Sequence, residues 1–500
     1  MSYTIDSDEN SDYMYNIIAG IINEIGPRPP CSENERKASK WIQKELEKFC
    51  ENVVIEDFFC RPGAFLGFLK VVVLLTIIST IIFLFSSYNS IFKMFFSAIP
   101  LGIMVFIFYI IYKSFLHYEE FLTPLFKKKR SQNVVGTIKP SGVVKKRIIF
   151  LGHIDSTLFN VMHYTKHGYG YYIVKGIASL LFFLLIFSFQ LINGIIQHNL
   201  EVFLIVMNSL VIILPVFLAI FFLVIARTEK IFFGVFKTMT ISSALIILAD
   251  VFYSFIIISI AFLFNQQSTL IDTALILLLI NIPSCICMYF FQSKNASPGA
   301  IDNLTAVAIC NCIAKILHDW KIQEIPLFPK NTEINILICG SEEAGLKGSQ
   351  AFAERHAEEY NKINTTCINF ESINNSRNLN IYSKETTTGT ILDEEINKDL
   401  LKISEDLKIK SQITVMPPYG GGTDGAGLVR GGLRATTIEG FIRDDYLFSY
   451  HSKRDCLDLI NKERRPGTDY GTNWKNRNVR CAMENALKIA IGYIKLVDGR

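Results

Sequence analysis

The chain has 500 residues, of which 50% are hydrophobic and only 19% are charged, a composition too apolar for an ordinary soluble enzyme. Its net charge of +4 is too small to indicate a nucleic-acid partner, and the polar segments hold no basic patch interleaved with aromatic residues. We therefore expect no nucleic-acid binding. The 11 cysteines are scattered without a C-x-x-C pair, which favours a reducing compartment over a disulfide framework.

Six apolar blocks interrupt the chain, each close to the roughly 20 residues that cross a bilayer. A buried core helix keeps a polar residue every few positions, and runs such as VVVLLTIISTIIFLF do not. We therefore predict six transmembrane helices, over residues 68–86, 94–112, 171–191, 202–226, 241–264 and 270–291. The lipid bilayer is then an expected partner of the chain.

The three polar pieces between these blocks have the composition of a globular α/β domain. In chain order, the pattern predicts an amphipathic helix within residues 32–50 and strands at 133–138 and 146–153. The second of these strands is apolar enough to be buried on both faces. The remaining predicted elements are a helix at 302–317, a strand at 334–340, a helix at 343–360, the end of a strand at 368–370 and a helix at 482–496.

The predicted spans fall into an insertion of two and an insertion of four. An even number returns the chain to the side of the membrane that it left, so the three polar pieces can form one domain. Lysines and arginines, including the run at 127–130, flank the spans on the side of this domain, while the opposite short loops at 86–90, 193–201 and 265–269 hold none. Because cytoplasmic loops carry the excess of positive charge, we expect a multi-pass membrane protein with a cytoplasmic domain.

Two adjacent glutamates, Glu342 and Glu343 in CGSEEAGLKGS, follow the strand predicted at 334–340. Neighbouring carboxylates repel each other unless positive charge lies between them, and a bound metal ion supplies such charge. Complementary ligands stand in other polar segments: His153 and Asp155 in LGHIDST, Asp302 in SPGAIDNLTAV, Glu371 after INF and His451 in YHSKRDCLDLI. Histidine with carboxylate and without cysteine is typical of a catalytic site for zinc or a similar divalent ion.

Taken in order, GHIDS, PGAIDN, CGSEEAGLKGS, NFES, GGTDGAGL and YHSKRD resemble the co-catalytic zinc exopeptidases of metallopeptidase family M28 (clan MH), which includes aminopeptidases and glutamate carboxypeptidase. The resemblance covers the polar portion of the chain. It implies an α/β fold, with a mixed central sheet flanked by helices as in zinc exopeptidases of the phosphorylase/hydrolase-like type. One peptidase domain would comprise residues 1–67, 113–170 and 292–500, interrupted by transmembrane insertions at 68–112 and 171–291.

The same resemblance implies two zinc ions, or similar divalent ions, held by five side chains. Asp302 would bridge the ions, His153 and Glu371 would complete the first site, and Glu343 and His451 would complete the second.

Three further residues receive roles by the resemblance. Glu342 would be the general base that takes a proton from the attacking water. Asp155 would orient the imidazole of His153, and Tyr450 could polarise the developing oxyanion. A fourth residue, Asp424 in GGTDGAG, is interpreted as a carboxylate that orders the glycine-rich loop.

The sequence departs from the commonest family pattern in two places. Position 371 is Glu where many soluble aminopeptidases of the family carry Asp, which leaves the choice of substrate terminus open. The segment between His153 and Asp302 contains four predicted spans, so we expect the catalytic cleft to lie close to the membrane surface.

The predicted function is that of a membrane-bound di-zinc exopeptidase, an aminopeptidase that hydrolyses short peptides. One alternative is a receptor or transporter that keeps a non-catalytic peptidase-like domain, which the presence of all five ligands and the base disfavours. The other is a mono-zinc glutaminyl cyclase, which the retention of His153 and Glu371 disfavours. The sequence makes no prediction of the oligomeric state.

Overall fold

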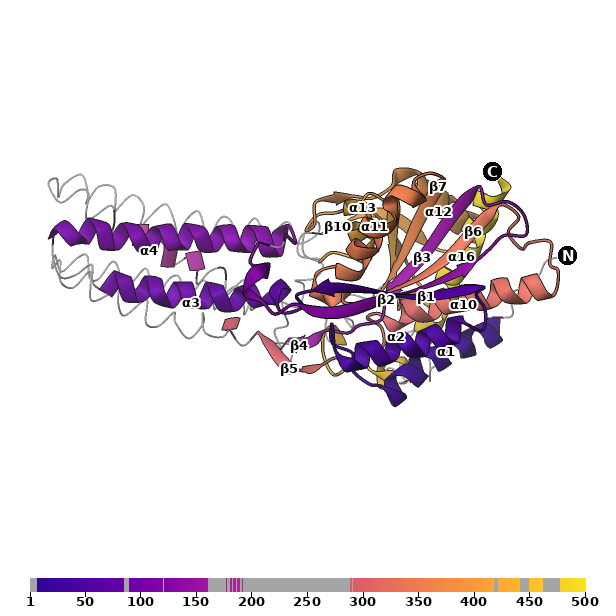
Figure 1. Ribbon diagram of the computed structural model, residues 1–500, viewed down its shortest axis with the longest axis horizontal. Coiled ribbons are helices and arrows are strands. Elements are labelled where there is room, and N and C mark those ends of the chain that lie inside the picture. The colour runs from indigo at the N-terminus through magenta and orange to yellow at the C-terminus, as the bar shows by residue number, and fades with distance from the viewer. Residues whose placement is uncertain are drawn as a thin grey trace. The chain divides into compact units, whose positions relative to one another are not determined.

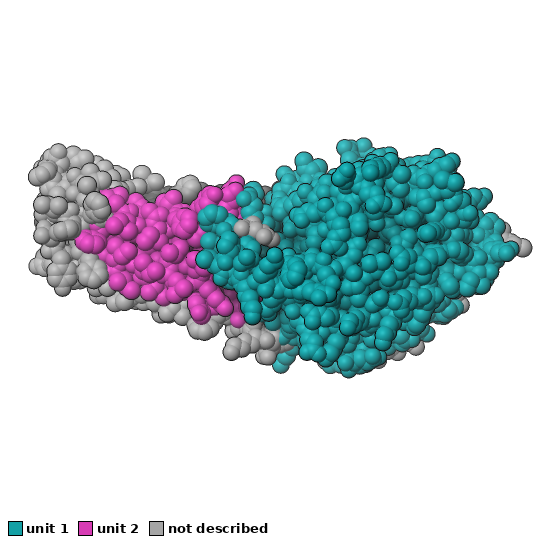
Figure 2. Space-filling model, in the orientation of Figure 1, with its two compact units in different colours: residues 1–65, 116–159, 294–500 teal, residues 66–115, 160–293 magenta. Residues whose placement is uncertain are grey.

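The computed structural model describes residues 7–84, 90–119, 121–160, 291–417, 421–440, 449–461 and 477–500, with isolated positions between 177 and 191 and residues 288 and 289. The chain divides into two units, coloured teal and magenta in Figure 2. Unit 1 holds Met1–Phe65, Leu116–Phe159 and Lys294–Arg500, and unit 2 holds Leu66–Phe115 and Asn160–Ser293.

Unit 1 is built on a mixed sheet (Figure 1). Its described strands are β1 Asn52–Cys60, β2 Lys129–Ile138, β3 Lys146–His153, β6 Thr332–Cys339, β7 Asn364–Glu371, β8 Leu379–Glu385, β9 Thr390–Ile391, β10 Ser411–Met416 and β11 Ala435–Glu439. They pair in the order β1-β2-β6-β3-β7-β11-β8-β10, with β9 against β8. The central strands β6, β3, β7 and β11 run parallel, whereas β2 pairs antiparallel with β1 and β6, and β8 with β11.

Helices cover both faces of this sheet, because successive side chains of each strand point to opposite faces (Figure 1). The described helices of unit 1 are α1 Ser7–Glu24, α2 Glu33–Leu46, α10 Leu304–Ile322, α11 Lys347–Tyr360, α12 Glu394–Asp406, α13 Asp424–Arg430, α15 Leu457–Asn461 and α16 Arg477–Gly499. Ile148 and Phe150 of β3 pack in a core with α1, α2, α10, α12 and α16, and Ile149 and Leu151 pack in a second core with α11 and α13. The prediction of a mixed α/β fold with a central sheet flanked by helices is confirmed.

The predicted helix at 343–360 begins later than expected, at Lys347. Glu342–Ala344 forms a short 3-10 turn instead, and both Ser341 and Leu346 have left-handed backbone conformations, with φ of 54° and 62°. Left-handed residues interrupt a right-handed helix, so the two glutamates lie on a separate turn between β6 and α11.

The carboxyl ends of three neighbouring parallel strands meet at one edge of the sheet. His153, the last residue of β3, pairs with Cys339, the last residue of β6. On the other side of β3, Leu151 pairs with Asn369 of β7, which places Glu371 at the end of β7 near the same edge. The register therefore gathers residues that are far apart in the sequence.

Gly152 lies where β3 packs against α10, and a Cβ at this position would stand 2.5 Å from the Cβ of Ala306. We expect Gly152→Ala to lower the free energy of unfolding by about 1–3 kcal/mol, because inserting a methyl group into a packed core forces the neighbours apart. Thermal unfolding of the variant measures this loss. Gly499→Ala is the matched control, since a Cβ at Gly499 meets nothing within 4 Å, and equal unfolding temperatures for both variants would contradict the prediction.

Unit 2 contains two long apolar helices in its described part, α3 Ala64–Leu84 and α4 Ser90–Ile111. The stretches Ala64–Phe83 and Ala98–Phe115 are long and apolar enough to cross a membrane, and they overlap the first two predicted spans. The four spans predicted within 171–291 lie outside the described residues, apart from isolated positions.

The two ends of the long segment between β4 and β5 are joined by strand pairing. β4 Leu158–Asn160 and β5 Gln292–Ala296 form a two-stranded sheet, and the backbone N–H of Ser297 donates to the carbonyl of Thr157 at 2.8 Å. We refer to this pairing as the β4–β5 seam.

Candidate metal centre

The first group of possible metal ligands joins His153, Asp302 and Glu371, whose ligand atoms all lie within 4.8 Å of one another. His153 Nε2 lies 3.2 Å from Asp302 Oδ1 and 3.7 Å from Glu371 Oε1. Two of these side chains come from the ends of β3 and β7, and Asp302 comes from the turn that leads into α10. All three are buried or nearly so.

The second group joins Asp302, Glu343 and His451, with the same 4.8 Å limit between ligand atoms. His451 Nε2 lies 3.3 Å from Asp302 Oδ2 and 3.3 Å from Glu343 Oε1. Asp302 is therefore common to both groups and turns one carboxylate oxygen toward each histidine. The structure brings together the five side chains that the sequence singles out as metal ligands.

The chemistry of this cluster fits bound cations. Glu342 lies beside the two groups, with Oε2 3.7 Å from His153 Nε2, so two buried and two partly buried carboxylates face two imidazoles. Burial raises the pKa of Glu342 and Glu343 and brings the pKa of Glu371 to about 7. Among the described residues, Glu343 Oε1 and Glu371 Oε2 are buried without a hydrogen-bond partner. Carboxylates in this state are stabilised by metal ions, and a donor set of nitrogen and oxygen suits zinc.

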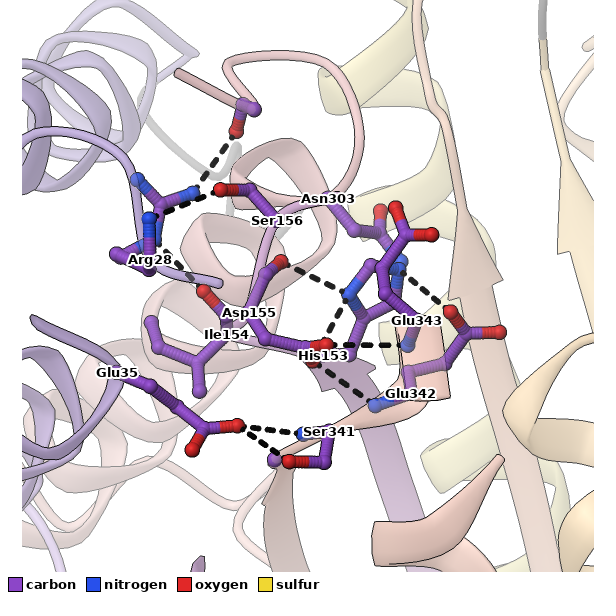
Figure 3. Close-up of polar contacts among 12 residues, drawn as sticks. Arg28, Glu35, His153, Ile154, Asp155, Ser156, Asn303, Ser341, Glu342 and Glu343 are labelled. Atoms are coloured by element: carbon purple, nitrogen blue, oxygen red, sulfur yellow. Dashed lines mark hydrogen bonds and ion pairs between the residues drawn. The ribbon is translucent and has the colours of Figure 1, made fainter. Parts of the chain in front are cut away.

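Asp155 connects the end of β3 with the turn that carries Glu342 and Glu343, which we call the glutamate turn. Its Oδ1 accepts the backbone N–H of Glu342 and its Oδ2 that of Glu343, both at 3.0 Å (Figure 3). The partner nearest to His153 Nδ1 is the backbone carbonyl of Asp155 at 3.1 Å, and the carboxylate lies 3.5 Å away. A proton on Nδ1 would leave Nε2 free to bind a metal ion, and Asp155 contacts both the imidazole and the backbone of the two glutamates.

Tyr450 stacks on the second histidine. The ring centroids of Tyr450 and His451 are 3.5 Å apart with an angle of 24° between the planes. The tyrosine also packs against the core on the α10 side of the sheet. These contacts position the ring beside a candidate ligand, and its role toward an oxyanion stays a prediction.

Asp455 is a buried carboxylate that the sequence motifs did not indicate as part of the site. It accepts the backbone N–H of Ile301 at 2.7 Å and that of Asp302 at 3.1 Å. Asp455 follows His451 by four residues. Its hydrogen bonds therefore connect the loop that carries His451 with the turn that carries Asp302. The spacing H-x-x-x-D in YHSKRD places Asp455 close to His451 in the sequence. Only the fold shows which backbone groups its carboxylate contacts.

Glu35 of α2 is a second buried carboxylate without an assigned role in the sequence. Its Oε1 accepts the backbone N–H of Ser341 at 2.7 Å and the Ser341 hydroxyl at 2.8 Å, as Figure 3 shows. Ser341 immediately precedes Glu342, so Glu35 holds the start of the glutamate turn. No motif in the sequence connects these two segments.

Arg28 binds backbone carbonyls next to the site. Its fully buried guanidinium donates to the carbonyl of Ile154 at 2.7 Å (Figure 3). It also donates to the carbonyls of Pro298 at 2.8 Å and Gly299 at 3.2 Å. These carbonyls flank His153 on one side and Asp302 on the other. The arginine thus joins two segments that the chain separates by a long insertion.

Asp424 does not make the contact expected from the sequence. It is buried at the start of α13, and its carboxylate oxygens have no hydrogen-bond partner among the described residues. Glu385 binds the glycine-rich loop instead, because it accepts the backbone N–H of Thr423 at 3.1 Å and the Thr423 hydroxyl at 2.5 Å. Which carboxylate would reach the loop depended on the position of β8, which the sequence motif does not contain.

The chain is similar to known proteins in part of its sequence and in its fold. A family model, Peptidase family M28, matches residues 290–465. The fold is similar to a zinc aminopeptidase from Bacillus subtilis, with 10% identity, a TM-score of 0.45 and coverage of 97% of this chain and 95% of that one. An aminopeptidase from Aneurinibacillus sp. strain AM-1 is 11% identical with a TM-score of 0.44, covering 97% and 92% of the two chains.

A glutaminyl cyclase from Tannerella forsythia is 11% identical with a TM-score of 0.43, covering 97% of this chain and 98% of that one. No curated protein sequence matches the chain. The family match spans Asp302, the two glutamates, Glu371 and His451, and all of these except Glu342 are members of the two ligand groups. Residues 290–465 therefore match the model of peptidase family M28, and this stretch contributes four of the five candidate metal ligands that the fold brings together.

Proposed function

We propose that this chain is a membrane-bound exopeptidase, an aminopeptidase that hydrolyses short peptides with two divalent ions per chain. The observation that carries the proposal is the pair of three-residue donor groups that share Asp302, with Glu342 beside both and a member of neither. The shared carboxylate fits a bridge between two ions, which lie roughly 3.5–4 Å apart in two-metal enzymes.

His153 and Glu371 would hold one ion and Glu343 and His451 the other, with Asp302 between them. When bound, the ions supply Lewis-acid chemistry, which makes water a nucleophile at neutral pH and polarises a carbonyl. Glu342 accepts a proton from the attacking water on its carboxylate and passes it to the leaving amine nitrogen as the peptide C–N bond breaks. Tyr450 donates a hydrogen bond to the substrate oxygen, and Asp155 keeps the proton of His153 on Nδ1.

The membrane part of the proposal is supported by the two apolar helices of unit 2 and by the four apolar blocks of the segment 171–291. Residues 1–67, 113–170 and 292–500 then form the peptidase domain, and 68–112 and 171–291 are its transmembrane insertions. The distribution of lysine and arginine favours a cytoplasmic domain.

Metal removal tests this function on the purified full-length chain. We expect a chelator to lower the hydrolysis of aminoacyl reporter peptides by at least about 100-fold, because catalysis by activated water requires the ions. Zinc should restore the rate, and metal analysis of the active protein should give two ions per chain.

Blocked peptides are the matched controls for the choice of terminus. An amidated carboxyl terminus should leave the rate unchanged, and an acetylated amino terminus should abolish hydrolysis. Cleavage of the acetylated peptide would support a carboxypeptidase instead. One ion per chain with cyclisation of amino-terminal glutamine would support a glutaminyl cyclase, and a metal-free, inactive protein would support a receptor or transporter.

A further inference from the structure

Two cysteine thiols from distant segments touch beside the glutamate turn. Cys31 lies in the loop between α1 and α2, and Cys60 is the last residue of β1. Their sulfurs are 3.3 Å apart, and both residues are in the thiol form. The sulfur of Cys31 also lies 3.5 Å from the hydroxyl of Ser341, the residue before Glu342.

The two thiols differ in a way that suits thiol–disulfide exchange. Cys31 is half-buried, whereas only 6% of Cys60 is exposed, so a reagent in solution meets Cys31 first. The hydrogen bond between the two thiols lowers the pKa of Cys31 and raises that of Cys60. Cys31 is therefore the better thiolate, and Cys60 is placed to resolve a mixed disulfide formed on it.

The loop that carries Cys31 is held firmly against the catalytic turn. The backbone N–H of Cys31 donates to Glu35 Oε2 at 2.8 Å and to Ser341 Oγ at 3.2 Å. Glu35 in turn binds the backbone and hydroxyl of Ser341. The same short network thus contains the half-buried thiol and the residue that precedes the proposed general base.

We propose that Cys31 and Cys60 are a site of reversible disulfide formation, made by exchange with a small disulfide such as oxidised glutathione. The thiolate of Cys31 attacks one sulfur of the small disulfide, and one glutathione leaves as a thiolate. Cys60 then loses its proton and attacks the sulfur of Cys31, and the second glutathione leaves. Two protein thiols are oxidised by two electrons, one small disulfide is reduced to two thiols, and their two protons pass to the departing thiolates.

Formation of this bond moves the cluster that holds the glutamate turn. The sulfurs must approach from 3.3 Å to about 2.05 Å, which changes the contact of Cys31 with the hydroxyl of Ser341. Because Ser341 is joined directly to Glu342, oxidation alters the position of the base. The effect on catalysis rests on the proposed peptidase function, whereas formation of the bond does not.

The test uses the purified full-length chain, incubated with oxidised or reduced glutathione, alkylated and mapped by mass spectrometry without reduction. We expect a peptide pair linked through Cys31 and Cys60 after oxidation, and its loss after treatment with dithiothreitol. Cys31→Ser and Cys60→Ser should each abolish the linked pair. Cys50→Ser is the matched control, since this half-buried thiol lies beside Gly136, at the end of β1 opposite to Cys60, and should leave the link intact.

A link between other cysteines, a glutathione adduct that persists on Cys31, or two alkylated thiols after oxidation would each overturn the site.

In the activity measurement, we expect oxidation to lower kcat by about 10- to 100-fold with little change in KM, because a displacement of about 1 Å at a catalytic group has this scale of effect. Both serine variants should be insensitive to oxidation. A mapped disulfide with unchanged kcat would overturn the coupling to catalysis, and a chain inactive in both redox states would overturn the peptidase function alone.

Discussion

Glu342→Gln leaves the metal content of the protein unchanged and lowers kcat by about 10²- to 10⁴-fold, the range expected for removal of a general base. The amide has the shape of the carboxylate but cannot accept the proton of the attacking water. Glu342 is a member of neither group of ligands, although its Oε2 lies 3.7 Å from His153 Nε2. Steady-state kinetics with metal analysis of the same preparation measures both quantities.

Glu354→Gln provides the control for this substitution. Glu354 is an exposed residue of α11, and its replacement makes the same chemical change away from the site. We expect wild-type kcat and metal content for this variant. Undiminished turnover by Glu342→Gln would refute the assignment of the base, and loss of metal from that variant would make Glu342 a ligand.

Asp302→Asn should remove both ions and all measurable hydrolysis. Asp302 is the only described residue common to the two ligand groups, with one oxygen 3.2 Å from His153 Nε2 and the other 3.3 Å from His451 Nε2. An amide has one oxygen and no negative charge, so it cannot bridge two cations. We expect zinc affinity to fall by more than the roughly 10- to 100-fold that follows loss of a hydrogen-bond partner of a ligand.

Glu371→Gln separates the two sites in the same experiment. Glu371 belongs to the first group alone, so its replacement should leave one tightly bound ion per chain. Zinc titration by calorimetry gives the stoichiometry, and circular dichroism checks that both variants remain folded. Equal metal loss in the two variants would contradict the distinct position of Asp302 between the sites.

The strand ends of unit 1 could be predicted from the sequence because a buried strand followed by polar residues is a local pattern. His153 after KRIIFLG and the glutamates after INILICG needed no knowledge of the fold. The motifs that contain these residues also predicted that Asp302, Glu371 and His451 belong to the same site. The grouping then follows from parallel strands that end at one edge of the sheet.

The supporting contacts could not be predicted, because they depend on which segments the fold places side by side. Glu35 and Ser341 lie 306 positions apart in the chain, and Arg28 reaches Gly299 across 271. The late start of α11 has a similar origin, since left-handed conformations at Ser341 and Leu346 oppose the helical pattern of the surrounding residues. The contact of Asp155 with both glutamate amides likewise requires the register between β3 and β6.

The β4–β5 seam makes the positions of the candidate ligands independent of the length of the segment between β4 and β5. Thr157 and Ser297 are hydrogen-bonded to each other, four residues after His153 and five before Asp302. The entropy of closing a long loop is therefore offset at this pairing and not at the ligands themselves. A longer or shorter segment between β4 and β5 would therefore leave the distance between the imidazole of His153 and the carboxylate of Asp302 unchanged.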